Sequence, residues 1–243
     1  MRGFTIGLAT ALLFTGLAGS PAISAEVGCT LKADSDGKCV EATLRGTIIA
    51  GDDEKVRALI QSSWPRLLMV DLHSPGGSVA EGLKIGRMLR RYLITTEVSD
   101  WILPSGHPSD PITYCTSACA LIWFGGVERM GRVGLHRPRI DDPEFANSPP
   151  DEAMKLYRKA IVGIEGYLTE MEVPRPVIDA MLVTSSSEIR WVDAVTAELS
   201  RPSSFAEWED ATCKTPFDPK LGPVLDACRG PLRSRQVREL SPP

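Results

Sequence analysis

The chain has 243 residues, of which 43% are hydrophobic and 24% charged, and its formal net charge is −4 at pH 7. This hydrophobic content is typical of a globular protein and excludes a disordered chain, and the length suffices for one domain with its own core and a small appendage. A mildly acidic chain without a basic stripe is a poor candidate for a nucleic-acid partner, and we expect none.

The N-terminal residues have the layout of a secretory signal peptide. Arg2 precedes an apolar run over residues 4–17, and small residues close the segment. The run is short for a transmembrane helix, although an uncleaved anchor is the alternative. We therefore expect residues 1–25 to be a signal peptide that is cleaved after Ala25 or after Ala22, and a mature protein that is periplasmic or secreted.

All six cysteines follow this leader, and an even number of cysteines in an exported chain indicates disulfides. Metal binding is the alternative, but the spacings match no zinc pattern and the histidines lie elsewhere, so no metal is expected. Proximity in the sequence suggests three disulfides, although other pairings stay open: Cys29–Cys39, Cys115–Cys119 and Cys213–Cys228.

Strand-like and helix-like segments alternate along the chain, and this predicts an α/β fold with a largely parallel sheet. Residues 203–243 are rich in proline and are expected to form a short, disulfide-stapled extension of the domain at 26–202. Strands are predicted at residues 41–49, 66–72, 93–98 and 132–136, helices at 52–63, 79–92, about 151–171 and after Pro176, and an apolar segment at 117–126.

The apolar strand at 66–72 runs into the sequence HSPGGS, and a helix follows directly. Gly76 and Gly77 allow backbone N–H groups at this turn to approach a ligand closely, and the start of the helix adds a partial positive charge. This arrangement suits an oxyanion, although ordinary strand-to-helix turns also carry glycine pairs.

Ser117 is the central residue of the sequence CTSAC at 115–119. A serine at the first turn of a helix is usually only a cap. As a nucleophile it would expose its Oγ, the N–H of Ala118 would be ready to donate, and a Cys115–Cys119 disulfide would stiffen the backbone around it.

A serine nucleophile needs a base, and the chain contains three histidines. His73 precedes the glycine turn, and His107 lies in a proline-rich loop at 99–114. His136 ends a predicted strand, where it can face a cleft at the carboxyl edge of the sheet.

Three stretches, LHSPGGSVAEGLKIGRML, CTSACALIWFGG and GLHRPR, resemble in order and spacing the proteolytic subunit of the Clp protease. They are most similar to a group of exported, ClpP-like bacterial proteins with a C-x-S-A-C serine motif, and the resemblance covers roughly residues 45–199. It implies a ClpP/crotonase-like α/β spiral and a serine peptidase, a hydrolase of peptide or protein substrates that uses no cofactor.

The same resemblance implies roles for individual residues. The family nucleophile falls on Ser117 and the family histidine on His136. The oxyanion donors fall on the backbone of Gly77 and Ala118, with Gly76 shaping the turn.

The third member of the triad is less narrowly defined. The favoured acid is Glu188, with Asp193 as the second choice, and Ser186 or Ser187 lies near the same place. Asp193 could equally cap a helix that begins at Ala194. Without an acid, the site would be a Ser–His dyad of lower activity.

Partners are predicted mainly from export. No ATPase partner is expected, because ATP is not available outside the cytoplasm of most bacteria, and the chain has no phosphate-binding P-loop. The helix at about 151–171 could form a homo-oligomer contact or could equally pack on the sheet of its own chain.

Three other functions stay open. A Ser–Lys mechanism like that of signal peptide peptidase A would need a lysine base, and Lys84 is not excluded. A crotonase-type acyl-CoA enzyme would need neither Ser117 nor a disulfide. A catalytically decayed, ClpP-like binding scaffold of the periplasm is the non-enzymatic alternative.

Overall fold

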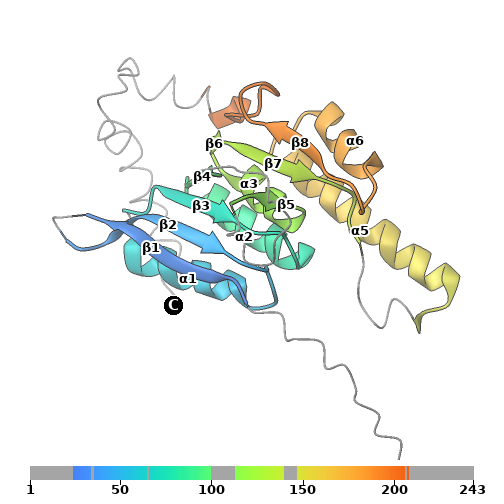
Figure 1. The fold of residues 1–243 in the computed structure, drawn as a ribbon, viewed down its shortest axis with the longest axis horizontal. Coiled ribbons are helices and arrows are strands. Elements are labelled where there is room, and N and C mark those ends of the chain that lie inside the picture. Colours follow the sequence, from blue (N-terminus) through green and yellow to red (C-terminus); the bar gives the residue numbers. More distant parts are fainter. Residues whose placement is uncertain are drawn as a thin grey trace, which may run out of the picture.

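The computed structural model describes residues 24–33, 36–64, 66–99, 113–139, 147–205 and 207, which form a mixed α/β structure (Figure 1). The strands are β1 (Glu26–Lys32), β2 (Cys39–Arg45), β3 (Met69–His73), β4 (Thr95–Glu97), β5 (Cys115–Thr116), β6 (Arg129–Met130), β7 (Arg132–Leu135) and β8 (Arg190–Asp193). The helices are α1 (Asp52–Ser63), α2 (Val79–Arg91), α3 (Ala118–Gly125), α5 (Pro150–Glu170) and α6 (Arg175–Val183).

The strands form two sheets. The five-stranded sheet has the order β1-β2-β3-β4-β6, in which β1 is antiparallel to β2 and the other pairings are parallel. The three-stranded sheet has the order β5-β7-β8, with β5 parallel and β8 antiparallel to β7. The predicted α/β fold with a largely parallel sheet is therefore confirmed, while the antiparallel edge strands β1 and β8 were not expected.

Helix α3 lies in the core, since all eight of its residues are buried, and this explains why its sequence is apolar on every side. Helix α2 packs against it through Gly82 and Gly86, which lie one turn apart. A Cβ built on Gly82 would lie 2.8 Å from the carbonyl oxygen of Ala118, and one on Gly86 would lie 3.0 Å from that of Leu121. Only residues without a side chain permit this approach, so α2 and α3 are held close together.

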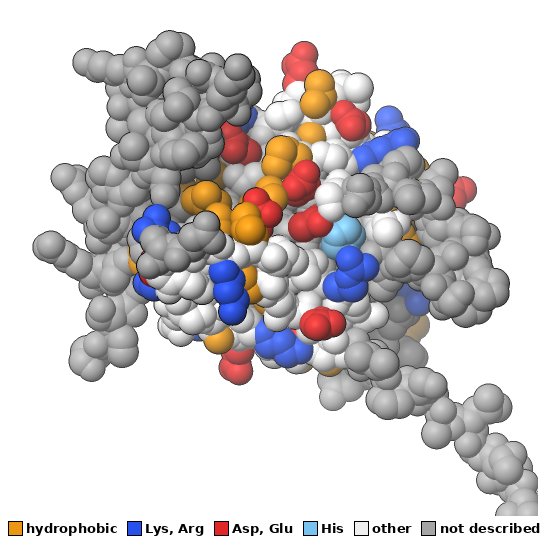
Figure 2. Space-filling model, turned by 60° about the vertical axis from the view of Figure 1, so that its left-hand side comes forward, with side chains coloured by type: hydrophobic (Ala, Val, Ile, Leu, Met, Phe, Trp, Pro, Cys, Tyr) orange, Lys and Arg blue, Asp and Glu red, His pale blue; other side chains and the backbone are white. Residues whose placement is uncertain are grey.

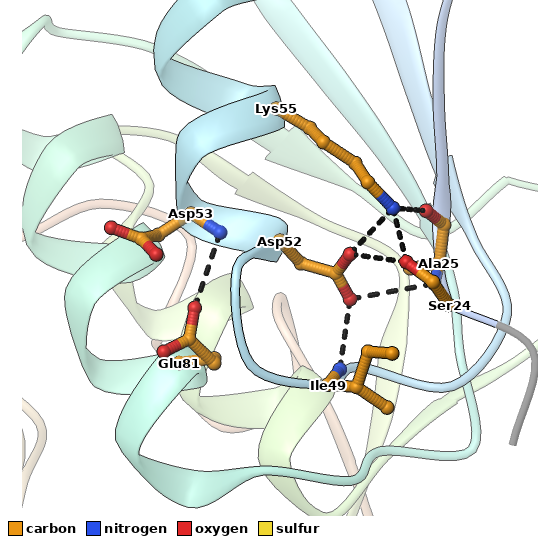
Figure 3. A network of polar contacts seen from close by, with 7 residues as sticks. All are labelled: Ser24, Ala25, Ile49, Asp52, Asp53, Lys55 and Glu81. Atoms are coloured by element: carbon orange, nitrogen blue, oxygen red, sulfur yellow. Dashed lines mark hydrogen bonds and ion pairs between the residues drawn. The ribbon is translucent and has the colours of Figure 1, made fainter.

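A polar network joins Ser24 and Ala25, the first described residues, to the start of α1 (Figure 3). The fully buried carboxylate of Asp52 accepts hydrogen bonds from Ser24 Oγ at 2.7 Å, from Ile49 N at 2.8 Å and from Lys55 Nζ at 2.8 Å. Lys55 Nζ also donates to the carbonyl oxygen of Ala25 at 2.9 Å, and Ala25 itself is buried. Ser24 and Ala25 are therefore packed into the domain.

Two of the predicted disulfides lie in the described part of the chain, and both are present. Cys29–Cys39 links β1 to β2, and Cys115–Cys119 links β5 to α3. Together they indicate an oxidising environment. The remaining predicted pair lies outside the described residues: Cys213–Cys228.

The described surface is mixed in character. Figure 2 shows a face on which acidic, basic and hydrophobic side chains are interspersed, with some hydrophobic side chains adjacent to one another. The described residues of this face therefore present no extended basic surface of the kind that binds nucleic acid. None of the helices within the described ranges is both long and apolar enough to span a membrane.

Candidate active site

Ser117 occupies a strained turn between β5 and α3. Its backbone has φ 58° and ψ −125°, and its side chain makes no capping hydrogen bond to α3. A non-glycine residue holds such a conformation only when the surrounding structure enforces it, and these residues concentrate at functional sites. A serine on a sharp strand-to-helix turn is also how the nucleophile is exposed in α/β-hydrolases. The interpretation of Ser117 as a simple helix cap is therefore wrong.

Two glycines make room for this turn. Gly76 has φ +101°, and a Cβ built on it would lie 2.9 Å from the carbonyl oxygen of Thr116. A Cβ on Gly134 of β7 would lie 2.7 Å from Cγ2 of Thr116. The glycine turn after β3 and the middle of β7 therefore both pack directly against the residue before Ser117.

Two backbone N–H groups of these turns are without acceptors among the described residues. One belongs to Gly77, which follows the glycine packed against Ser117, and the other to Ala118, which follows Ser117 itself. Ile48 bonds to the residues on either side of Gly77, donating to Gly76 O and accepting from Ser78 N, so this pairing does not use the Gly77 N–H. Ala118 begins α3, where an N–H has no partner within the helix. Two such donors near a serine can stabilise an oxyanion.

The pairing of β5 with β7 brings His136 to the same edge of the sheet as Ser117. Thr116 is paired with Gly134, and Ser117 N donates to Gly134 O at 3.1 Å. His136 follows two residues later, directly after the end of β7, and is half-buried. No hydrogen bond joins the two side chains among the described residues, so their closeness rests on the strand register.

The His136 ring is oriented by the backbone. Its Nδ1 lies 2.8 Å from the carbonyl oxygen of Arg137. Because a carbonyl only accepts, this contact requires Nδ1 to carry the hydrogen. In the neutral ring Nε2 is then the unprotonated nitrogen, which is the tautomer that a general base needs.

The two candidate acids differ clearly in position. Leu135 pairs with Arg190, so Glu188 lies just beyond the last pair of β7 and β8, near His136, and its side chain is exposed. Among the described residues its carboxylate has no hydrogen bond or ion pair. Asp193 pairs instead with Arg132, at the far end of β7.

The carboxylate of Asp193 is also engaged locally. It accepts hydrogen bonds from Val195 N at 2.9 Å and Thr196 N at 3.0 Å. These bonds stabilise a turn at residues 194–198, so the expected helix beginning at Ala194 is absent and that prediction is wrong. Asp193 is therefore unsuited to act as the acid beside His136.

Lys84 is tied to carboxylates on the solvent side of α2. Its Nζ lies 2.7 Å from Glu81 Oε1 and 3.7 Å from Asp53 Oδ1, and its side chain is 56% exposed. The hydrogen bond to Glu81 raises the pKa of Lys84. A lysine base must lose its proton near neutral pH, so Lys84 is unsuited to a Ser–Lys mechanism.

A second histidine cluster, which sequence reasoning missed, lies on β3. His73 is buried, and its Nε2 contacts Asp71 Oδ2 at 2.8 Å, while Ser99 Oγ donates to the same carboxylate. Burial alone raises the pKa of Asp71, but hydrogen bonds from His73 and Ser99 bring it below its usual value. The D-x-H spacing, which puts both side chains on one face of a strand, was the available signal.

No set of three or more metal-binding side chains is gathered within the described ranges. No protein-family model matches the sequence, and no curated protein matches it. Among solved structures, a point mutant of ClpP1 from Listeria monocytogenes is similar in fold, with 14% identity and a TM-score of 0.46. The alignment covers 68% of this chain and 94% of that chain.

Proposed function

We propose that this protein is an exported, ATP-independent serine peptidase that hydrolyses peptide bonds with Ser117 as the nucleophile and His136 as the base. The observation that supports this most is the strained turn at Ser117, flanked by two N–H groups without acceptors among the described residues. We place its activity in the periplasm or outside the cell, since the two disulfides are those of an oxidising compartment.

In the proposed reaction, His136 Nε2 takes the proton from Ser117 Oγ as this oxygen attacks the scissile carbonyl. The Gly77 and Ala118 N–H groups stabilise the oxyanion, and loss of one such donor typically slows a reaction by about 100- to 1,000-fold. His136 then gives its proton to the leaving amine, and water releases the acyl group from Ser117.

The proposed third member, Glu188, competes with a backbone oxygen. Nδ1 of neutral His136 carries one hydrogen, and the Arg137 carbonyl lies within hydrogen-bond distance of it. Glu188, being exposed, would have to displace this contact or act on the ring from farther away. We therefore propose a dyad oriented by the backbone, with a supporting electrostatic role for Glu188.

A fluorophosphonate probe tests this function directly. The purified mature protein should be labelled at Ser117, and the label should vanish in Ser117→Ala and in His136→Ala. Lys84→Ala should still be labelled, because Lys84 is held by acidic partners. Absence of labelling while a control hydrolase reacts would favour the alternative, a catalytically decayed binding scaffold of the periplasm.

A digest of a peptide library by the labelled preparation would then identify the preferred substrates. Cleavage that requires Ser117 and proceeds without nucleotide would support the peptidase. Labelling without cleavage of any peptide would instead point to a hydrolase acting on other esters or amides.

A further inference from the structure

We propose that the Cys115–Cys119 disulfide is a positioning element for the candidate active site, because it holds the Ser117 backbone in its strained conformation. This inference rests on the proposed peptidase function for its effect on rate. Its structural part concerns only how the turn is held.

The Cys115–Cys119 disulfide encloses only the short turn that contains Ser117. Its two cysteines lie four residues apart, with Cα atoms 5.3 Å from each other. Between them are Thr116, the nucleophile Ser117 and Ala118, which supplies an oxyanion donor. A cross-link of this length therefore encloses the residues whose relative placement the reaction would need.

Both ends of the cross-link are anchored. Cys115 is paired with Val133 of β7 and also forms an isolated bridge with Ser74, directly before the glycine turn. Cys119 is in the first turn of α3, which is buried throughout. The disulfide thus ties the end of a paired strand to the start of a core helix, and the strained residue lies between them.

Noncovalent contacts alone do not hold the Ser117 turn in its strained conformation. Ser117 N donates to Gly134 O, and Thr116 Oγ1 donates to Pro75 O at 3.0 Å, so hydrogen bonds fix the strand side of the turn. On the helix side, the Ser117 carbonyl oxygen accepts a hydrogen bond from Ala120 N at 3.0 Å, but no side chain caps the start of α3. Gly76 and Gly134 provide space but make no side-chain contact that would hold the strained conformation.

The burial of Cys115 and Cys119 indicates that their disulfide is a permanent structural cross-link and not a redox switch. Cys115 and Cys119 are both fully buried, so a thiol reductant can reach their sulfurs only after the core opens locally. Cys29 of the other disulfide is only partly buried. The Cys29–Cys39 bond, which joins β1 to β2, is therefore the matched control, since it lies in another part of the fold.

The experiment compares Cys115→Ala/Cys119→Ala with Cys29→Ala/Cys39→Ala in the full mature chain. In the first variant the rate of fluorophosphonate labelling and kcat should fall between about tenfold and about 100-fold, with KM little changed, since small displacements of reacting groups cost that much. Cys29→Ala/Cys39→Ala should keep the wild-type labelling rate within about twofold, even if its Tm falls as much as that of Cys115→Ala/Cys119→Ala.

Amide hydrogen exchange gives a second readout that does not depend on activity. Exchange at residues 116–120 should become faster in Cys115→Ala/Cys119→Ala and stay unchanged in the control. If the probe labels wild type, and labels folded Cys115→Ala/Cys119→Ala equally fast, the proposed positioning role of the disulfide is wrong. If wild type is not labelled, the proposed peptidase function is wrong. Unchanged exchange at 116–120 in Cys115→Ala/Cys119→Ala would overturn the positioning role of the disulfide as well.

A third measurement applies if Cys115→Ala/Cys119→Ala does not fold. Wild-type protein is treated with increasing phosphine, and the freed thiols are alkylated and mapped by mass. Cys29 and Cys39 should become alkylated first without loss of labelling, and labelling should decline in step with alkylation of Cys115 and Cys119. Full labelling with all four thiols alkylated would overturn the proposal.

Discussion

A Cβ built on Gly76 would lie 2.6 Å from the Cβ of Ser117, closer than two such atoms approach in real structures. The glycine turn and the serine turn are therefore packed directly on one another, although they are distant in the sequence. The same glycine has φ +101°, which side chains disfavour. The candidate site is thus assembled by backbone proximity, and its sensitivity to added methyl groups is the first property to test.

Gly82→Ala should disturb the site from the α2 side. The new methyl group would lie 2.8 Å from the carbonyl oxygen of Ala118, so α2 and α3 must move apart. We expect labelling at Ser117 to slow by about tenfold or more, and the free energy of unfolding to fall by about 1–3 kcal/mol. Labelling kinetics and chemical denaturation measure the two effects.

Gly163→Ala in α5 is the control, because beyond the backbone of its own helix no heavy atom of the described residues lies within 4 Å of a Cβ built there. Alanine is the better helix former, so this variant should gain up to about 1 kcal/mol and label at the wild-type rate. Equal labelling by Gly82→Ala and wild type would show that the spacing of α2 and α3 does not control the site.

Glu188→Gln should retain most of the activity. The carboxylate is exposed, and the Arg137 carbonyl already lies at His136 Nδ1, so we expect kcat/KM to fall by less than about tenfold. His136→Ala should lose far more. A loss near the roughly 10⁴-fold seen when a triad aspartate is replaced would instead establish Glu188 as the acid that orients the ring.

Asp52→Asn should destabilise the fold in a pH-dependent way. Burial alone raises the pKa of Asp52, but hydrogen bonds from Ile49, Lys55 and Ser24 bring it below the usual value of 3.8. Because the folded-state pKa is the lower one, the carboxylate stabilises the fold above about pH 4, and this contribution is lost as pH falls through the folded-state pKa.

At pH 7 the variant should therefore lose about 1.5–3 kcal/mol of unfolding free energy, and the difference from wild type should shrink in acid. Asp36→Asn is the comparison, since Asp36 is solvent-exposed and its interactions are screened by water, so its contribution should be small. Denaturation midpoints between pH 3 and pH 7 measure both. A constant difference across that range would contradict the assignment.

The exposed hydrophobic side chains of α5 should mediate self-association. The buried residues of this helix lie near its C-terminal end, whereas Leu156 is 44% and Val162 67% exposed, and in Figure 1 the helix extends to the right of the strands. Val162→Glu should lower the mass measured by light scattering. Val195→Glu, at another exposed valine, should not. A monomeric wild type would refute the contact.

Elements with strong periodicity were predictable, and the helix expected at 52–63 coincides with α1 (Asp52–Ser63). The strands β5 and β6 have two residues each, which is too short for a pattern. The four residues of β8 are exposed or half-buried, so no clear alternation marks them. Strands β5 and β8 depend on pairing with β7, and β6 depends on pairing with β4, which are properties of the folded chain.

Within the candidate site, the order of the glycine, serine and histidine motifs was visible in the sequence. The backbone conformation of Ser117 was not, because a positive φ at serine is imposed by its surroundings. The choice between Glu188 and Asp193 also depended on register, since the two residues are close in sequence but lie toward opposite ends of β7.

The hydrogen bonds that join Asp52 and Lys55 to Ser24 and Ala25 affect where the predicted leader can be cleaved. Cleavage of the leader after Ala25 would remove a buried residue and a hydroxyl bonded to Asp52, whereas cleavage after Ala22 would keep both. We expect intact-mass measurement of the exported chain to give Ile23 as the first residue. The processing enzyme would then cut before Ser24 and Ala25, so both residues would keep their hydrogen bonds to Asp52 and Lys55.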